Sequence, residues 1–186
     1  MLSRIYLPGE IYFITTNIYQ RSKIFNKDWA CKLFIDVLNK CRLKYRFKLY
    51  GYVIIPDHVH LLIMPDDKMN ISEIIHRIKG NFAYQYIMAR NHEGSATRGG
   101  LNHASKRVAD PLWVGDHRIH INPIWQKSFY DHIIRNDLDF EEKLGYIHGN
   151  PIKHRLIDNL DNYPWSSYQN YYFNHNDLIE IDYLEL

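Results

Sequence analysis

The chain has 186 residues, of which 46% are hydrophobic and 24% are charged, and its formal net charge at pH 7 is only +2. This length fits one domain over residues 1–186 with a sizeable core, because domains of about 100 to 200 residues are the ordinary case. The sequence has no run of about 18 apolar residues and no apolar leader, which excludes a membrane-spanning protein and predicts a soluble, cytoplasmic one.

A strand and an amphipathic helix are predicted first. Residues 11–18 are rich in β-branched and aromatic side chains, which indicates a strand. Asp28 can then cap a helix that runs to about Tyr45, because the apolar residues between them recur at helical spacing. This stripe, which we interpret as core, consists of Ala30, Leu33, Phe34, Val37, Leu38 and Cys41.

Two strands and a second helix follow. Residues 47–55 and 58–64 predict an antiparallel hairpin, joined by a tight Pro-Asp turn. Asn70, with Glu73 three residues later, resembles a capping box at the start of a helix. The buried stripe predicted for that helix consists of Ile71, Ile74, Ile75, Ile78, Phe82 and Tyr86.

The regular pattern stops over residues 91–123, where glycine and proline are frequent, so we expect a long loop there. Residues 124–134 predict a fourth strand. Asn136 or Asp137 then begins a third helix, which should end near Pro151 because the residue before a proline avoids helical dihedral angles.

The order βαββαβ followed by a helix predicts an α+β fold with a ferredoxin-like antiparallel sheet. Two helices would cover one face of the sheet, and the C-terminal helix, which carries Tyr146, would lie on the other face. Residues from about 170 to 186 are expected to form a short C-terminal tail.

Two histidines stand one residue apart in the third predicted strand. Side chains at i and i+2 of a strand share a face, so His58 and His60 are expected to point the same way. Either histidine alone is more simply interpreted as a buried, hydrogen-bonded core residue. Both together, in an otherwise apolar strand, indicate half of a metal site, because a divalent cation is one partner that offsets their desolvation.

The third predicted helix carries a phenol and an amide outside its buried stripe. Tyr146 and Asn150 lie one turn apart and roughly 100° around the helix from the stripe. Taken alone, Tyr146 is more simply interpreted as one packing tyrosine among 15. Two imidazoles and an amide oxygen, however, can hold Mg²⁺ or Mn²⁺ with positions open for phosphate oxygens, and a nearby phenol can attack phosphorus. The buried stripe itself is Phe140, Leu144 and Ile147.

Four stretches of sequence together form a specific pattern. They are YVIIPDHVHLLIMP at 52–65, WQKSFYDHIIRN at 125–136, GYIHGNPIKHRL at 145–156 and YPWSSY at 163–168. A histidine pair alone is weak evidence, but Tyr-x-x-x-Asn-Pro and YPWSSY at this distance make the pattern strong. At these residues the sequence resembles the HUH single-tyrosine transposases and, within them, the REP-associated tyrosine transposases.

The resemblance implies that His58 and His60 are metal ligands, that Tyr146 is the nucleophile and that Asn150 is a third ligand. Better-known single-tyrosine transposases often carry glutamine at this last position. The resemblance further implies an enzyme that binds single-stranded DNA with a foldback hairpin. With Mg²⁺ or Mn²⁺ it would cleave and rejoin that strand through a 5′-phosphotyrosine. Relatives of this kind include dimers with shared active sites as well as monomers, so a homodimer stays open.

Two stretches of positive side chains are candidates for contacts with nucleic-acid phosphates. They are Arg90, Arg98, Lys106, Arg107 and Arg118 in the first stretch, and Lys153 and Arg155 in the second.

Three alternative functions stay open. The first is a rolling-circle replication initiator or relaxase with the same residues. The second is a domesticated nucleic-acid-binding protein that does not cleave, which would need aromatic side chains on the open sheet face for base stacking. The third is a metallohydrolase that uses water, for which Tyr146 would be dispensable.

Overall fold

The structure, a computed structural model, describes residues 6–95 and 123–184, and the side chains of all of these except 92–95. The described strands form one antiparallel sheet in the order β2-β3-β1-β4. The strands are β1 Tyr12–Asn17, β2 Lys48–Ile55, β3 His58–Met64 and β4 Tyr130–Ile133. The helices are α1 Asp28–Tyr45, α2 Ile71–Ser95, α3 Asp137–Lys153 and α4 Tyr168–Phe173. Short 3-10 helices are η1 Tyr19–Arg21, η2 Ile24–Asn26 and η3 Leu160–Asn162.

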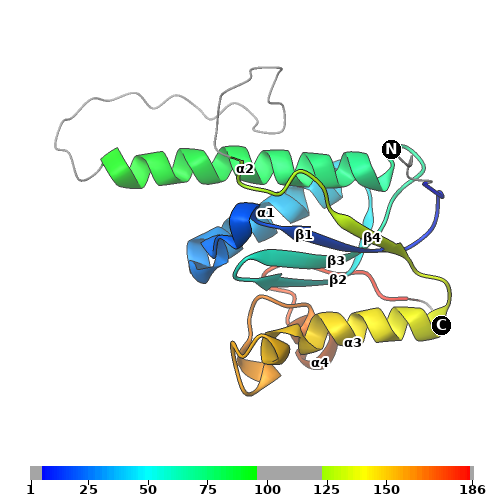
Figure 1. Ribbon diagram of the computed structural model, residues 1–186. Coiled ribbons are helices and arrows are strands. Elements are labelled where there is room, and N and C mark those ends of the chain that lie inside the picture. Colours follow the sequence, from blue (N-terminus) through cyan, green and yellow to red (C-terminus); the bar gives the residue numbers. More distant parts are fainter. Residues whose placement is uncertain (1–5, 96–122, 185–186) are drawn as a thin grey trace.

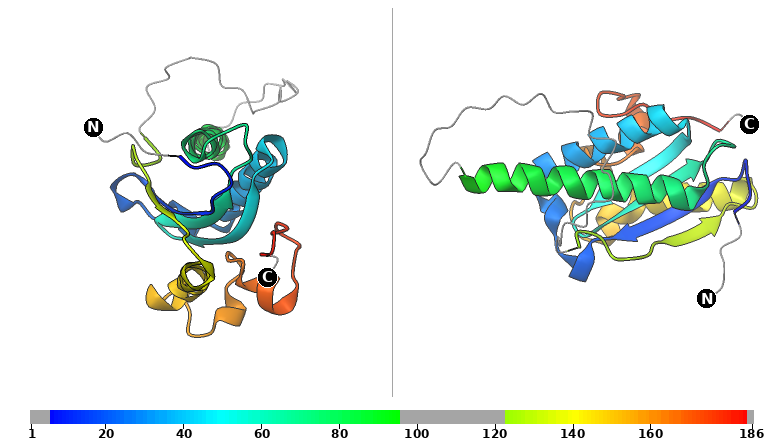
Figure 2. Two further views of the ribbon diagram at one scale, coloured as in Figure 1. Left: turned by 90° about the vertical axis from the view of Figure 1, so that its right-hand side faces the viewer. Right: turned by 90° about the horizontal axis from the view of Figure 1, so that it is seen from above.

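The sheet is the middle layer of the molecule. Helices α1 and α2 lie on one face, and α3 and α4 lie on the other (Figures 1 and 2). The predicted α+β class, with two helices on one face and the tyrosine-bearing helix on the other, is therefore confirmed. None of the helices in the described part of the chain combines the length and the apolar composition needed to span a bilayer.

The face under α1 and α2 holds the larger part of the core. The apolar stripes predicted for both helices are buried there, with Leu33 only partly so. The capping box of α2 is present: Asn70 Oδ1 accepts from Glu73 N, and Glu73 Oε2 accepts from Asn70 N, each at 3.0 Å. At α1 the prediction was wrong by one residue, because Lys27 is the N-cap and Asp28 lies in the first turn.

Two boundaries near the expected loop also differ from the prediction. Helix α2 continues to Ser95, beyond the expected loop start at 91, because a helix keeps its internal hydrogen bonds after its apolar stripe has ended. The fourth strand begins only at Tyr130. Before it, Trp125 pairs with Ile18 only in an isolated bridge, and Lys79 Nζ donates to the carbonyls of Gln126 at 2.6 Å and Ser128 at 3.1 Å. The rest of the expected loop lies outside the described residues.

Helix α3 was predicted to end near Pro151 because of the residue before the proline, but it continues through that residue and the proline to Lys153. Asn150 and Pro151 are both buried, so tertiary packing holds the residue before the proline in a helical conformation. The last turn then closes through His154 N, which donates to Asn150 O at 2.9 Å. This extra turn places Lys153 and His154 at the site described below.

The C-terminal stretch runs along the outer edge of β2. Ile54 N donates to Trp165 O at 2.9 Å, and Ser167 N donates to Tyr52 O at 2.9 Å. Further on, Asp182 N donates to Leu49 O at 2.8 Å. The stretch expected as a tail thus includes most of α4, and through Asp182 it contributes, with Trp165 and Ser167 before it, to covering an edge that would otherwise present unpaired backbone groups.

Candidate active site

Strand β3 places His58 and His60 side by side on the sheet face that α3 covers. Their ring centroids lie 4.8 Å apart at an interplanar angle of 85°. Both side chains are buried. In the part of the chain that is described, no group of three histidine, cysteine or acidic side chains could hold a metal ion, so any ion here needs a ligand of another type.

Neighbouring strand β1 fixes His60. Thr15 lies opposite His60 in the β1–β3 register, and its Oγ1 is 2.8 Å from His60 Nδ1. The ring of Phe13 stacks on the imidazole at 5.4 Å between centroids. Burial, aided by the positive field of nearby side chains, lowers the pKa of His60 to about 3, so the ring is neutral at pH 7. Its Nε2 atom has no hydrogen-bond partner among the described residues.

Asp57 orients His58. Its Oδ1 is 2.6 Å from His58 Nδ1, and its Oδ2 lies 3.4 Å from Arg21 Nη1. Burial lowers the pKa of His58, and Asp57 only partly opposes this. Burial, the largest single influence, would raise the pKa of Asp57, but the hydrogen bond and charge of His58 together with the charge of Arg21 outweigh it, and the pKa is lowered. An ionised Asp57 must accept from Nδ1, so the lone pair of His58 lies on Nε2.

Helix α3 brings Tyr146 over the histidine strand. The phenol ring meets His60 at 5.3 Å between centroids and Phe13 at 5.8 Å. Tyr146 is 39% exposed, so it contacts the buried imidazole and can still be reached from solvent. Lys153 Nζ, two turns further on, lies 4.6 Å from the centroid of the same ring.

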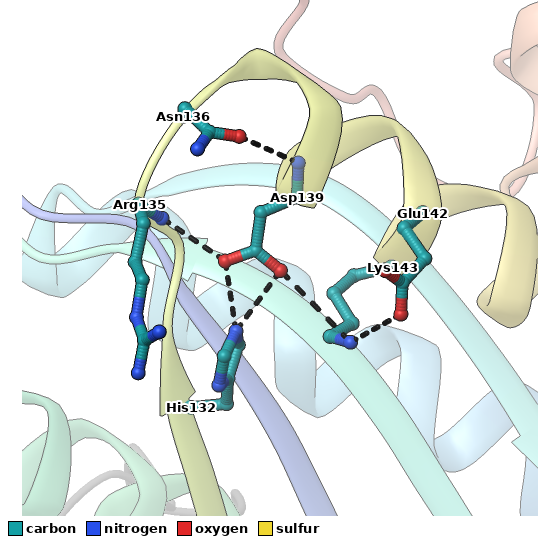
Figure 3. Close-up of polar contacts among 6 residues, drawn as sticks. All are labelled: His132, Arg135, Asn136, Asp139, Glu142 and Lys143. Atoms are coloured by element: carbon teal, nitrogen blue, oxygen red, sulfur yellow. Dashed lines mark hydrogen bonds and ion pairs between the residues drawn. The ribbon is translucent and has the colours of Figure 1, made fainter.

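A glycine and a polar contact set the distance between α3 and the sheet. A Cβ atom on Gly51 of β2 would lie 3.0 Å from Leu144 Cδ1, so a larger residue would require the Leu144 side chain to shift. At the start of α3, Asp139 accepts from His132 Nε2 at 2.8 Å and from Arg135 N at 3.1 Å (Figure 3). The Asn136 side chain caps the helix by accepting from Asp139 N at 3.0 Å (Figure 3).

Asn150 lies one turn beyond Tyr146 on α3. It is 0% exposed, and its Nδ2 donates to the Tyr146 carbonyl at 3.4 Å. Its Oδ1 atom has no hydrogen-bond partner among the described residues, like His60 Nε2. Buried acceptors are normally paired, so the unpaired nitrogen of His60 and the unpaired oxygen of Asn150 are each unusual. Neutral imidazole nitrogens and an amide oxygen are groups that bind divalent cations, so the residues present fit such an ion.

Only part of the predicted basic set lies near these groups. Lys153 contacts Tyr146, and Arg155 follows it in an exposed position. Arg90 is exposed on α2, which lies across the sheet from α3 (Figure 1). The predicted Arg98, Lys106, Arg107 and Arg118 lie outside the described residues.

Sequence reasoning missed several residues of this region. Asp57 stands next to His58 in the sequence, and its carboxylate was a signal that we assigned only to a turn. Phe13 and Thr15 reach His60 through strand pairing, which no local pattern reveals. His154, whose ring centroid lies 5.1 Å from that of His58, depends on the helical turn beyond Pro151.

The model of a protein family described as "Transposase IS200 like" matches residues 10–102, half of the chain, including the histidine strand. The chain belongs to the IS200-like transposase family. It is therefore a member of a family of DNA-processing enzymes, and the resemblance found in the sequence motifs is confirmed.

Curated relatives extend the match beyond that range. A protein of Haemophilus influenzae, assigned as a REP-associated tyrosine transposase, is 27% identical over 166 residues, which cover 89% of this chain and 83% of the relative. The REP-associated tyrosine transposase of Escherichia coli K12 is 22% identical over 167 residues, 89% of this chain and 80% of the relative. The solved structure of a REP-associated tyrosine transposase bound to a REP hairpin covers 100% of this chain and 92% of its own, with a TM-score of 0.68 and 21% identity. This last match shows the shared fold.

The unpaired amide oxygen of Asn150 predicts an unusual effect on stability. In metal-free protein, Asn150→Leu should leave the free energy of unfolding unchanged or raise it by up to about 2 kcal/mol, because a buried unpaired acceptor is removed. Asn170→Leu is the matched control, since Asn170 Nδ2 donates to Asn176 Oδ1 at 2.9 Å and to Ile179 O at 2.8 Å. That variant should lose about 1–3 kcal/mol. Chemical denaturation with EDTA present measures both, and an equal loss for the two variants would show that Asn150 is a structural residue.

Proposed function

We propose that this protein is a DNA-strand transferase that cleaves and rejoins single-stranded DNA through a 5′-phosphotyrosine on Tyr146. One observation carries the proposal: a partly exposed phenol lies against a buried, neutral imidazole whose Nε2 has no partner among the described residues. One helical turn beyond that phenol, the buried Asn150 also has an amide oxygen without a described partner. A tyrosine that only packed in the core would not need unpaired acceptors near it. Membership of the IS200-like transposase family supports a reaction on DNA at this arrangement.

The partner that we propose is a single strand with a foldback hairpin. A protein of the same fold is bound to a REP hairpin in its solved structure, and the curated relatives carry the corresponding name. Lys153, the last residue of α3, places positive charge beside Tyr146, where a phosphate would approach, and the exposed Arg155 follows it in the chain. Base pairing within the hairpin would leave the flanking strand unpaired and accessible.

The reaction requires a nucleophile held at one phosphate. The Tyr146 oxygen attacks phosphorus and forms a new P–O bond, the bond to the 3′ oxygen breaks, and the phenolic proton is lost while the leaving oxygen gains one. A 3′-hydroxyl can later attack the phosphotyrosine and release Tyr146. One phosphodiester replaces another in each step, so no ATP is needed. Lys153 faces the developing negative charge with its ammonium group.

His58, His60 and Asn150 would hold the Mg²⁺ or Mn²⁺ that the family chemistry implies. Such an ion supplies Lewis-acid polarisation of a phosphate oxygen. The chain's own contribution is to keep the two imidazoles neutral by burial and to fix their rings through Asp57 and Thr15. All of these groups come from one chain, so a single copy can supply the proposed site, and a homodimer is not required for it.

Replacement of Tyr146 by phenylalanine tests the nucleophile. The change removes one oxygen and keeps the ring, so the free energy of unfolding should change by less than about 1 kcal/mol. Formation of a covalent adduct with hairpin DNA, seen on a denaturing gel, should fall by at least roughly 10³-fold. Tyr130→Phe is the matched control and should keep the adduct. If cleavage by Tyr146→Phe continues without any adduct, water is the nucleophile and the transferase proposal fails.

Replacement of His60 by alanine tests the metal site by a direct binding measurement. Loss of a ligand should weaken Mn²⁺ binding by more than the roughly 10- to 100-fold typical of outer-shell changes, and should abolish cleavage. Hairpin binding should largely persist, because phosphate contacts supply most of the affinity. His76→Ala, an exposed histidine on α2, is the control and should change neither property. Parental Mn²⁺ affinity in His60→Ala would exclude a metal site on this strand.

The opposite positions of Lys153 and Arg90 predict different salt effects. Lys153→Gln should reduce the slope of log affinity against log salt by about 1, since one phosphate contact is lost. Arg90→Gln removes the same charge from α2, which lies on the opposite side of the sheet from α3 (Figure 1), and should leave the slope unchanged. Binding titrations between low and physiological salt measure both slopes, and equal slopes for the two variants would place the DNA elsewhere.

A further inference from the structure

We infer that Tyr130 is a stacking platform for an unpaired nucleobase next to the phosphate that Tyr146 attacks. The inference rests on the proposed function and adds to it a residue that holds the substrate strand in register. Tyr130 begins β4, the outermost strand of the sheet on the β1 side. Its role would be binding, without any covalent step of its own.

The strand register places Tyr130 on the face that carries the candidate site. Thr15 pairs with His60 on one side and with Tyr130 on the other, and directly paired residues share a sheet face. The ring of Phe13 lies between the groups concerned: its centroid is 6.4 Å from Tyr130, 5.4 Å from His60 and 5.8 Å from Tyr146. A single ring, that of Phe13, therefore contacts both Tyr130 and the proposed nucleophile Tyr146.

Tyr130 is more exposed than the rings of Phe13, His60 and Tyr146 beside it. Phe13 and His60 are buried and Tyr146 is 39% exposed, whereas Tyr130 is 59% exposed. Its contact with Phe13 is edge-to-face, at an interplanar angle of 71°, which leaves ring surface open to solvent. An exposed tyrosine on an edge strand is common when considered alone. Its shared contact with the ring that supports both His60 and Tyr146 is the feature that points to a role in substrate binding.

The platform is rigid although it lies on a short edge strand. Before β4, Lys79 holds the backbone carbonyls of Gln126 and Ser128. After Tyr130, His132 donates to Asp139 in the first turn of α3, at 2.8 and 3.0 Å from the two carboxylate oxygens (Figure 3). The same helix carries Tyr146, so the stacking ring and the nucleophile are held in a fixed relation. A rigid aromatic ring binds a base at low entropic cost.

The exposed ring of Tyr130 can stack on an unpaired base of any type. Each base has a π-face that can stack on an aromatic side chain, and such stacking tolerates sequence variation. Tyr130 would thus fix the position of the strand relative to Tyr146, and would leave recognition of the sequence to other contacts.

The test measures stacking separately from cleavage. A hairpin oligonucleotide with single-stranded flanks carries 2-aminopurine at one flank position at a time, and the cleavage position is first mapped with the parental protein. Binding is then followed by fluorescence in Tyr146→Phe protein with EDTA, so that no cleavage occurs. We expect quenching at a position adjacent to the mapped cleavage site.

Three substitutions, each combined with Tyr146→Phe, isolate the ring of Tyr130. Tyr130→Ala should lose this quenching and weaken binding by about 5- to 150-fold, as expected for one base stack. Tyr130→Ile, which keeps strand propensity and bulk, should also lose the quenching, whereas Tyr130→Phe should keep it. Tyr172→Ala is the control, because Tyr172 is 64% exposed but stacks on Tyr168 of α4. It should change neither quenching nor affinity.

The outcomes separate this inference from the proposed function. Unchanged quenching and affinity in Tyr130→Ala and Tyr130→Ile would overturn the stacking role, while adduct formation by the parental protein would still uphold the transferase. Quenching that depends on Tyr130 but lies far from the mapped cleavage site would overturn the inference as well. If the parental protein forms no adduct, the proposed function fails by its own measurement.

Discussion

The burial of His60 is the constraint on which the rest of this face depends. Phe13 stacks on its ring and Thr15 holds Nδ1, while Nε2 has no partner among the described residues. An unpaired buried acceptor costs about 1–3 kcal/mol, a large fraction of the stability of an ordinary domain. A leucine or isoleucine at this position would avoid that cost, as Leu62 does two residues later. The fold therefore tolerates a local loss of stability to keep a neutral nitrogen available, which is the expected signature of a functional position.

Helix α3 makes several groups depend on one packing geometry. Tyr146, Asn150 and Lys153 follow each other at helical spacing, so the position of the helix on the sheet sets all three at once. That position is fixed by the close approach at Gly51, by the His132–Asp139 contact at the start of the helix, and by His148, whose Nε2 is 3.0 Å from Ser167 Oγ. The site is thus held by regular elements rather than by loops, which suits a reaction that needs precise placement of a nucleophile.

The sequence predicted what depends on local periodicity. The bounds of β3 and the stripes of α1 and α2 are as expected, because strand alternation and helical spacing report burial directly. Contacts across strands, such as Thr15 with His60, depend on a register that no short pattern contains. The start of β4 was missed because the pairing with β1 changes register between the Ile18–Trp125 bridge and the Thr15–Tyr130 pair, which no local pattern contains. The end of α3 was missed because packing around Pro151 overrides the local preference of the residue before a proline.

The two faces of the sheet differ, and this difference bears on whether the proposed DNA substrate is single-stranded or double-stranded. Under α1 and α2 the sheet is buried by aliphatic and aromatic side chains. On the other face α3 packs against β2 and β3, while Tyr130 on β4 remains exposed beside the row of Phe13, His60 and Tyr146. In a duplex the π-faces of the bases are stacked on their neighbours and cannot meet a protein ring, whereas an unpaired base can. The exposed ring of Tyr130 next to the phenol therefore fits the proposed function if the strand is unpaired at the proposed position of cleavage, whereas a paired duplex there would leave that ring without a base to stack on.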